Sequence, residues 1–326
     1  MTVREERLGP ANAVRIPAPR RDPRRPMPVP PPEDAADLAR YLRATSARAD
    51  ADDLHTAHRH CGVAIEAAGR WRAGAALAAA YSLRTSVGRR MGALAGAERD
   101  GELAARVFPG DPGGDAAMLL RARRIATRLD AGDVAGAERL LIGFAGELPD
   151  GNGAMALRYV RGTLFAATGR PGEALADLFA SGERLAARQA DRPGVLPWRS
   201  AAASILVATG AVEAAGRLAA AEVAAARRSG PASALGRALR VEGSVPGGPG
   251  LDALLEAAKV LERTPRRFEY ALALTDLGVA LTVARRRPQA RRVLREAQAI
   301  AGECGSPALA RRASAAYAAA GGKPRP

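Results

Sequence analysis

Turn segments marked by glycine or, in one case, by proline recur along this chain at an almost constant interval, and this regularity constrains the fold more than any other feature. The turns lie at positions 132, 169, 210, 248 and 287. Successive intervals are therefore 37, 41, 38 and 39 residues. In the most regular unit, we predict helices over 154–168 and 173–189, joined by a turn over 169–172. Gly169 suits the left-handed position that ends a helix, and Pro171 suits the first turn of the next helix.

A period near forty residues with two helices in each unit is typical of a tetratricopeptide-like solenoid. We expect an earlier unit to turn at Gly69, which leaves room for one degenerate unit before position 132. The breaks expected to separate successive pairs are rich in glycine and proline and lie at 109–114, 149–153, 191–197 and 244–250. The sequence therefore predicts an all-α protein, a tetratricopeptide-like solenoid of about six antiparallel helix pairs over 34–320. Solenoids of this kind present a concave face, where we expect a protein or peptide partner.

The amino-acid composition favours helices for most of the chain, and it differs at the two ends. The chain is rich in alanine and has only 4% aromatic residues, which favours helix over strand. Residues 1–33 combine many arginines with many prolines, which cannot propagate a helix and offer little apolar surface. We predict a disordered arm over 1–33 and a disordered tail over 321–326.

The formal net charge of +15 comes almost entirely from arginine, because Lys259 and Lys323 are the only lysines. A genome rich in G and C would produce this composition without any functional cause. An affinity for nucleic acid phosphates would also explain it. The densest basic patch comprises Arg285, Arg286, Arg287, Arg291, Arg292 and Arg295. It is either a solvated surface or a site for phosphates or acidic peptides, and charge alone does not decide between them.

Targeting signals and cysteines indicate the compartment. Cys61 and Cys304 are far apart in sequence and fit no disulfide framework, which suggests a reducing environment. The N-terminal segment has no apolar core of a signal peptide, and no stretch approaches 18 apolar residues. We therefore expect a soluble cytoplasmic protein without membrane contact.

One short segment gathers the residue types that bind metals. His55, His58 and Cys61 follow one another at intervals of three residues, which is compatible with metal binding on a helix face. The same segment also makes an ordinary apolar stripe with Leu54 and Ile65. With no second cluster of ligands elsewhere, we predict no metal site. The sequence contains no recognisable catalytic motif, so we predict neither an enzyme nor a cofactor.

Several blocks in the last 130 residues carry a resemblance to a known family. They begin with Pro-Trp-Arg-Ser-Ala-Ala at 197–202 and include the segments 206–210, 224–231, 235–240, 267–278, 290–297 and 304–310. In this order and spacing they resemble the helical-repeat region of the large ATP-binding LuxR-type transcriptional regulators of actinobacteria. The resemblance covers 197–320 and is vaguer over 35–190.

Members of that family join an ATPase, a helical array and a helix-turn-helix domain. This sequence has no Gly-x-x-x-x-Gly-Lys-Ser/Thr phosphate loop, and it ends where the helix-turn-helix would follow. The resemblance implies a regulatory array without those two domains, either a stand-alone protein or a piece of a split regulator. We predict a non-catalytic regulatory scaffold that binds a protein or peptide. The alternative is a transcription regulator, or a truncated part of one, that associates with DNA through its basic patches.

Overall fold

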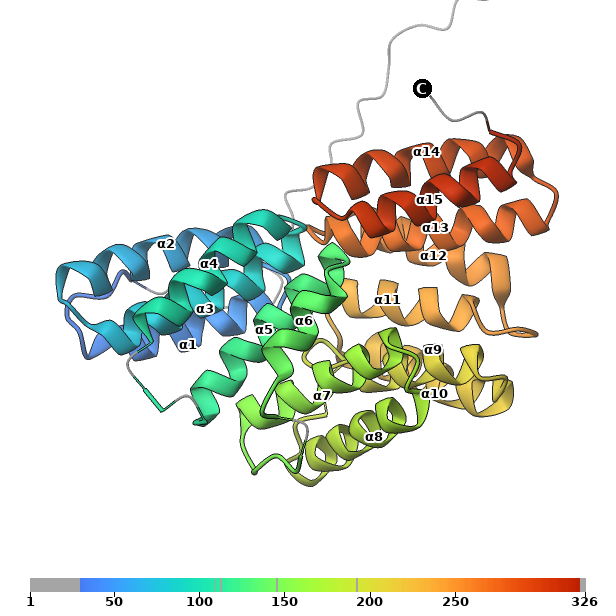
Figure 1. Ribbon diagram of the computed structural model, residues 1–326. Coiled ribbons are helices and arrows are strands. Elements are labelled where there is room, and N and C mark those ends of the chain that lie inside the picture. Colours follow the sequence, from blue (N-terminus) through green and yellow to red (C-terminus); the bar gives the residue numbers. More distant parts are fainter. Residues whose placement is uncertain (1–29, 109, 112, 145, 192, 323–326) are drawn as a thin grey trace, which may run out of the picture.

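The computed structural model describes residues 30–108, 110–111, 113–144, 146–191 and 193–322. Within this part of the chain there are fifteen α-helices and no strand, so the predicted all-α fold is confirmed (Figure 1). The helices are α1 (Asp37–Asp50), α2 (Leu54–Arg70), α3 (Gly74–Met91), α4 (Leu94–Val107), α5 (Asp115–Ala131), α6 (Val134–Leu141), α7 (Asn152–Ala167), α8 (Pro171–Ala187), α9 (Trp198–Ala208), α10 (Val212–Ser229), α11 (Ala232–Gly243), α12 (Gly250–Glu262), α13 (Arg267–Val283), α14 (Arg287–Glu303) and α15 (Pro307–Ala319). The predicted arm over 1–33, except its last four residues, and most of the predicted tail lie outside the described residues.

A residue with positive φ marks the turn inside each of seven successive helix pairs. These residues are Asp52, Gly92, Gly132, Gly169, Gly210, Gly247 and Arg285. Their spacing is 40, 40, 37, 41, 37 and 38 residues, which continues the predicted period to the start of α1. Positive φ is easily adopted by glycine and is tolerated by aspartate, which explains most of the residue types at these turns.

Two details of the predicted repeat are wrong. Gly69 lies inside α2, just before the connection to the next pair, whereas the turn that matches the period in that region is at Gly92. The glycine-rich segment 244–250 lies inside the α11–α12 pair and does not separate two pairs. Glycine and proline identify a turn, but they do not indicate whether it lies within a pair or between pairs.

The helices form an inner and an outer set. Each odd-numbered helix from α1 to α13 packs against the next odd-numbered helix as well as against its neighbours in sequence. Among the described helices, the even-numbered ones contact only helices that adjoin them in the chain, so they lie outside. Small side chains allow this close packing, because alanine is the commonest residue of the buried core.

The chain curves until its last helices contact its first ones. Helix α13 packs against α3, and α15 packs against α5 (Figure 1). The carboxylate of Asp52 accepts hydrogen bonds from the backbone N–H and the hydroxyl of Ser233, at 2.9 and 2.7 Å. The hydroxyl of Ser306 donates to the carbonyl oxygen of Asp130 at 2.6 Å. We call these contacts between the two ends the closing seam.

At two of the turns, the contacts of the closing seam leave no room for a side chain and therefore require glycine. A Cβ atom on Gly92 would lie 2.5 Å from the sulfur of Cys304, and one on Gly132 would lie 2.5 Å from the Cβ of Ala308. Both glycines also have positive φ, near +85°. Only glycine satisfies both conditions, so these turns serve the end-to-end contact as well as their own helix pairs.

The length and apolar character of the helices bear on insertion into a membrane. Among the described residues, no helix combines the length and the apolar character that crossing a bilayer requires.

Candidate functional site

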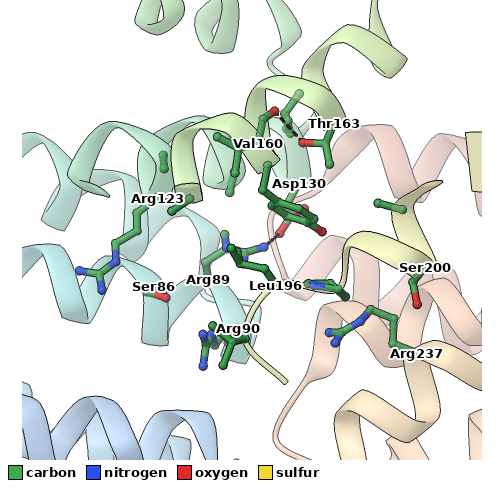
Figure 2. Close-up of a pocket in the computed structure, with 18 of the residues that line it drawn as sticks. Ser86, Arg89, Arg90, Arg123, Asp130, Val160, Thr163, Leu196, Ser200 and Arg237 are labelled. Atoms are coloured by element: carbon green, nitrogen blue, oxygen red, sulfur yellow. Dashed lines mark hydrogen bonds and ion pairs between the residues drawn. The ribbon is translucent and has the colours of Figure 1, made fainter. Parts of the chain in front are cut away.

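A cavity of about 740 Å³ lies between the inner helices (Figure 2). All seven odd-numbered helices from α1 to α13 contribute to its wall, together with the segment 190–197 before α9. Helices α6 and α8 contribute one residue each, Val134 and Leu185. The inner helices thus surround one cavity that is partly open to solvent, because the closing seam draws the first and last helices together.

Six arginines line this cavity, and five of them have a carboxylate partner. The pairs are Arg89 with Asp130 at 2.7 Å, Arg90 with Asp50 at 3.0 Å, Arg237 with Glu269 at 3.5 Å, Arg240 with Asp276 at 2.8 Å and Arg266 with Asp52 at 3.0 Å. Pairing of this kind is expected, because an isolated guanidinium taken out of water is costly. The Arg266–Asp52 pair also belongs to the closing seam, so the cavity and the seam share a residue.

Arg123 is the sixth arginine and has no carboxylate partner within ion-pair distance among the described residues. Its Nη1 donates to the hydroxyl oxygen of Ser82 at 2.8 Å, and this is its only hydrogen bond there. A guanidinium carries five N–H donors, so most of its donor capacity is unused. Burial, and then the nearby charge of Arg90, lowers the pKa of Arg123 to about 10. The cavity therefore contains one positive charge that the described protein does not neutralise.

An apolar surface adjoins Arg123 directly. On α5, Leu119, Arg123, Ala126 and Asp130 follow at helical spacing and all line the cavity. Facing helices add apolar side chains, among them Met155 of α7. The wall therefore combines a charged part, formed mainly by α3, α11 and α13, with an apolar part.

Glu269 at the start of α13 lies among several of these arginines. Burial alone would raise the pKa of its carboxyl, but Arg237, Arg240 and Arg266 together hold that pKa below its usual value. One of its oxygens, Oε2, is buried without a hydrogen-bond partner among the described atoms, as is Nη2 of Arg266. Burial and the charge of Arg90 lower the pKa of Arg266 to about 10. In the part of the wall formed by α3, α11 and α13, the arginine and carboxylate charges therefore nearly cancel, but some of their polar atoms lack hydrogen-bond partners.

The structure separates the three residues with metal-binding side chains. His55 and His58 are exposed, whereas Cys61 is fully buried in the core, where burial raises the pKa of its thiol to about 12. Among the described residues, no group of three histidines, cysteines, aspartates or glutamates is arranged to hold a metal ion. Cys304, also buried, belongs to another cluster.

The predicted basic patch is a surface of the α13–α14 turn and the outer face of α14. All its arginines are exposed except Arg291, whose guanidinium donates to the carbonyl oxygen of Ala320 at 3.1 Å. None of the six has a carboxylate within ion-pair distance in the described part of the chain. The patch therefore remains a free basic surface, on the outside of the molecule and apart from the cavity.

No protein-family model matches the chain, and no curated protein matches it either. The resemblance to the helical-repeat region of LuxR-type regulators consequently stays a prediction from the residues quoted above.

Sequence reasoning did not find the cavity arginines. Arg123 lies in the segment Arg-Ala-Arg-Arg, which looks like an ordinary solvated helix face. One signal was present, because Arg123 occupies the same helical stripe as Leu119 and Ala126. A basic residue within an apolar stripe indicates either a snorkelling side chain or a lined cavity.

Proposed function

We propose that this protein is a non-catalytic regulatory binding module, a tetratricopeptide-like solenoid whose concave face receives its ligand in the central cavity. The observation that carries this proposal is that seven inner helices contribute to one cavity of about 740 Å³. Cavities that bind small molecules commonly enclose about 300–1,000 Å³ and have largely apolar walls with a few polar groups. The resemblance of 197–320 to a regulator's helical array supports a regulatory role.

The closing seam favours a compact ligand over an extended one. In an open solenoid a peptide runs along the concave groove across several repeats. Here the α13–α3 and α15–α5 contacts bring the two ends of that groove together. A small molecule, or the end of a partner's chain, suits such an enclosure better than a long segment does.

The side chains around the cavity suit binding rather than chemistry. Its lining contains no histidine or cysteine among the described residues, and each of its three carboxylates faces an arginine. The arginines around Glu269 hold the pKa of its carboxyl below its usual value, which makes it a poor general base, whereas burial raises the pKa of Asp130 although it is paired with Arg89.

Filling the cavity tests this proposal. Ser86 on α3 lines the cavity and makes no hydrogen bond through its hydroxyl among the described residues, so Ser86→Trp would occupy part of the space. We expect the neutral fluorescent probe N-phenyl-1-naphthylamine to bind the wild-type protein and to lose at least about tenfold in affinity in the variant. Ala299→Trp, on the exposed face of α14, is the matched control and should bind like the wild type. Equal binding by all three proteins would contradict the proposal.

A second candidate function rests on the basic patch. Its six arginines have no carboxylate partners among the described residues, which is the arrangement that attracts nucleic acid phosphates. We propose association with DNA through this surface as the alternative. It predicts an affinity that falls steeply with salt, whereas occupation of the cavity by an uncharged ligand should hardly respond to salt.

A further inference from the structure

We propose that the ligand of the central cavity is a small amphiphilic monoanion, whose single negatively charged group binds Arg123 while its apolar body packs on the adjoining wall. This inference rests on the proposed function and names the chemical class of the ligand. A carboxylate, a sulfonate and a phosphate diester share the required chemistry, which is one delocalised negative charge with several acceptor oxygens.

The numbers of arginines and carboxylates around the cavity indicate a ligand with one negative charge rather than several. Of the six cavity arginines, five have a carboxylate within 3.5 Å, and one of these carboxylates, Asp276, also pairs with Arg312 outside the cavity lining. In the part of the chain that the structure describes, Arg123 alone is left without one, so a single added negative charge would complete the pairing. A dianion would bring a second charge for which no unpaired arginine remains in the described lining.

The geometry of α5 places the charge beside an apolar surface. Arg123 lies one helical turn from Leu119 on one side and from Ala126 on the other, and all three line the cavity. Its side chain is anchored at one end by Ser82, which leaves the rest of the guanidinium fork for a ligand. Figure 2 shows Arg123 at one side of the cavity, with Arg89 and Arg90 nearby and Arg237 opposite. An anion bound at this edge of the cavity would leave its attached body to extend back along α5 towards Leu119 and Ala126.

Binding would also relieve an electrostatic cost in the protein. Arg90 and Arg123 repel each other, and burial already disfavours the charged form of Arg123, whose pKa falls to about 10. A bound anion compensates both effects, because it supplies the opposite charge beside the guanidinium. The protein should therefore be more stable with the ligand than without it.

A matched pair of probes tests the charge requirement. The dye 8-anilinonaphthalene-1-sulfonate carries one sulfonate on the same aromatic body as the neutral N-phenyl-1-naphthylamine. In fluorescence titrations of the full chain at constant ionic strength, we expect the sulfonate to bind about tenfold more tightly than the neutral probe. Arg123→Met should remove that preference and leave the affinity for the neutral probe unchanged, which also shows that the variant is folded. Arg123→Lys should retain most of the preference, and Arg292→Met, on the outer patch, should behave like the wild type.

Competition separates an amphiphile from a free anion. Decanoate should displace the bound sulfonate probe at an about tenfold lower concentration than decanol, whereas inorganic phosphate should not displace it. Displacement by phosphate as effective as by decanoate would overturn the amphiphile requirement.

The remaining outcomes distinguish this inference from the proposed function. If both probes bind equally, Arg123→Met changes neither, and Ser86→Trp weakens both, the cavity binds ligands but the monoanion inference is wrong. If Ser86→Trp leaves both affinities unchanged, or neither probe binds the wild type, then both proposals are wrong.

Discussion

The arginines of the cavity and the arginines of the outer patch are the same residue type in opposite situations. Inside, five of six guanidiniums have a carboxylate within 3.5 Å. On the α13–α14 surface, none of the six has one among the described residues. Water stabilises the outer charges, whereas the inner ones require partners supplied by the protein. The net charge of +15 therefore includes two physically different groups of arginines, which only their position in the fold distinguishes.

Buried and exposed ion pairs should respond differently to loss of the carboxylate, and the largest effect is expected at Asp52. Asp52→Asn leaves Arg266, whose side chain is only 5% exposed, without its carboxylate partner. Asparagine tolerates the positive φ of this position, so backbone strain should contribute little. We expect the free energy of unfolding to fall by about 3 kcal/mol, measured by urea denaturation.

The matched outer variant is Glu303→Gln, which removes the exposed partner of Arg267. It should change the free energy of unfolding by less than about 0.5 kcal/mol. Similar losses in Asp52→Asn and Glu303→Gln would show that inner and outer ion pairs do not differ in the way described.

The outer group of arginines is tested by binding to DNA. If the patch binds phosphates, replacing Arg286, Arg287 and Arg292 with glutamine should weaken binding to a 20-base-pair duplex by about tenfold at low salt. The slope of the logarithm of affinity against the logarithm of salt should become shallower by about 1 for each arginine–phosphate pair that the substitutions remove. Fluorescence anisotropy measures both quantities, and Arg123→Met is the control that should leave them unchanged. A triple variant that binds like the wild type would remove the patch from consideration.

The buried carboxylate of Glu222 offers a further test of how burial affects charged groups, with a smaller expected change in the free energy of unfolding. Glu222 is 1% exposed; its Oε2 lies 3.5 Å from Arg199, and its Oε1 has no hydrogen-bond partner among the described atoms. Burial raises the pKa of Glu222 in the folded protein, so its ionisation destabilises the fold increasingly as pH rises above the unfolded value of about 4.3. Glu222→Gln should therefore raise the free energy of unfolding by about 1 kcal/mol at pH 7 and by almost nothing at pH 4. A destabilised variant at pH 7, or the same difference at both pH values, would show that Arg199 compensates the charge fully.

Much of the fold was predictable from the chain because the turn signals are local. Gly169 and Pro171 end one helix and begin the next through their own backbone preferences, and the structure has its helices where those residues predict them. The turn at Gly92 was not predicted, because Gly69 was assigned as the turn of that region and the next unit was expected to be degenerate. The 244–250 segment was misassigned because glycine and proline do not indicate whether a turn lies within a pair or between pairs.

The cavity was not predictable for a different reason. It depends on the closing seam, which results from small rotations added over seven helix pairs, and no local residue pattern records that sum. The aspartates at 52 and 53 appear in the sequence only as adjacent acids. In the structure, however, Asp52 joins α11 and α13 to the first turn of the molecule. Arg123 could be recognised as a cavity residue only once these elements were placed together.

The closing seam has a consequence for how the molecule unfolds. In an open array of helix pairs, a terminal unit can fray by itself, and hydrogen exchange becomes faster towards the ends. Here the hydroxyl of Ser306 is bonded to a carbonyl 176 residues earlier, and Arg266 is paired with an aspartate 214 residues earlier. Opening α15 therefore also breaks its packing against α5, and the two ends should exchange their amide protons together. Contacts between such distant residues form late and slowly in folding, so the last step of folding would be the joining of the ends, and the ligand cavity would be completed only then.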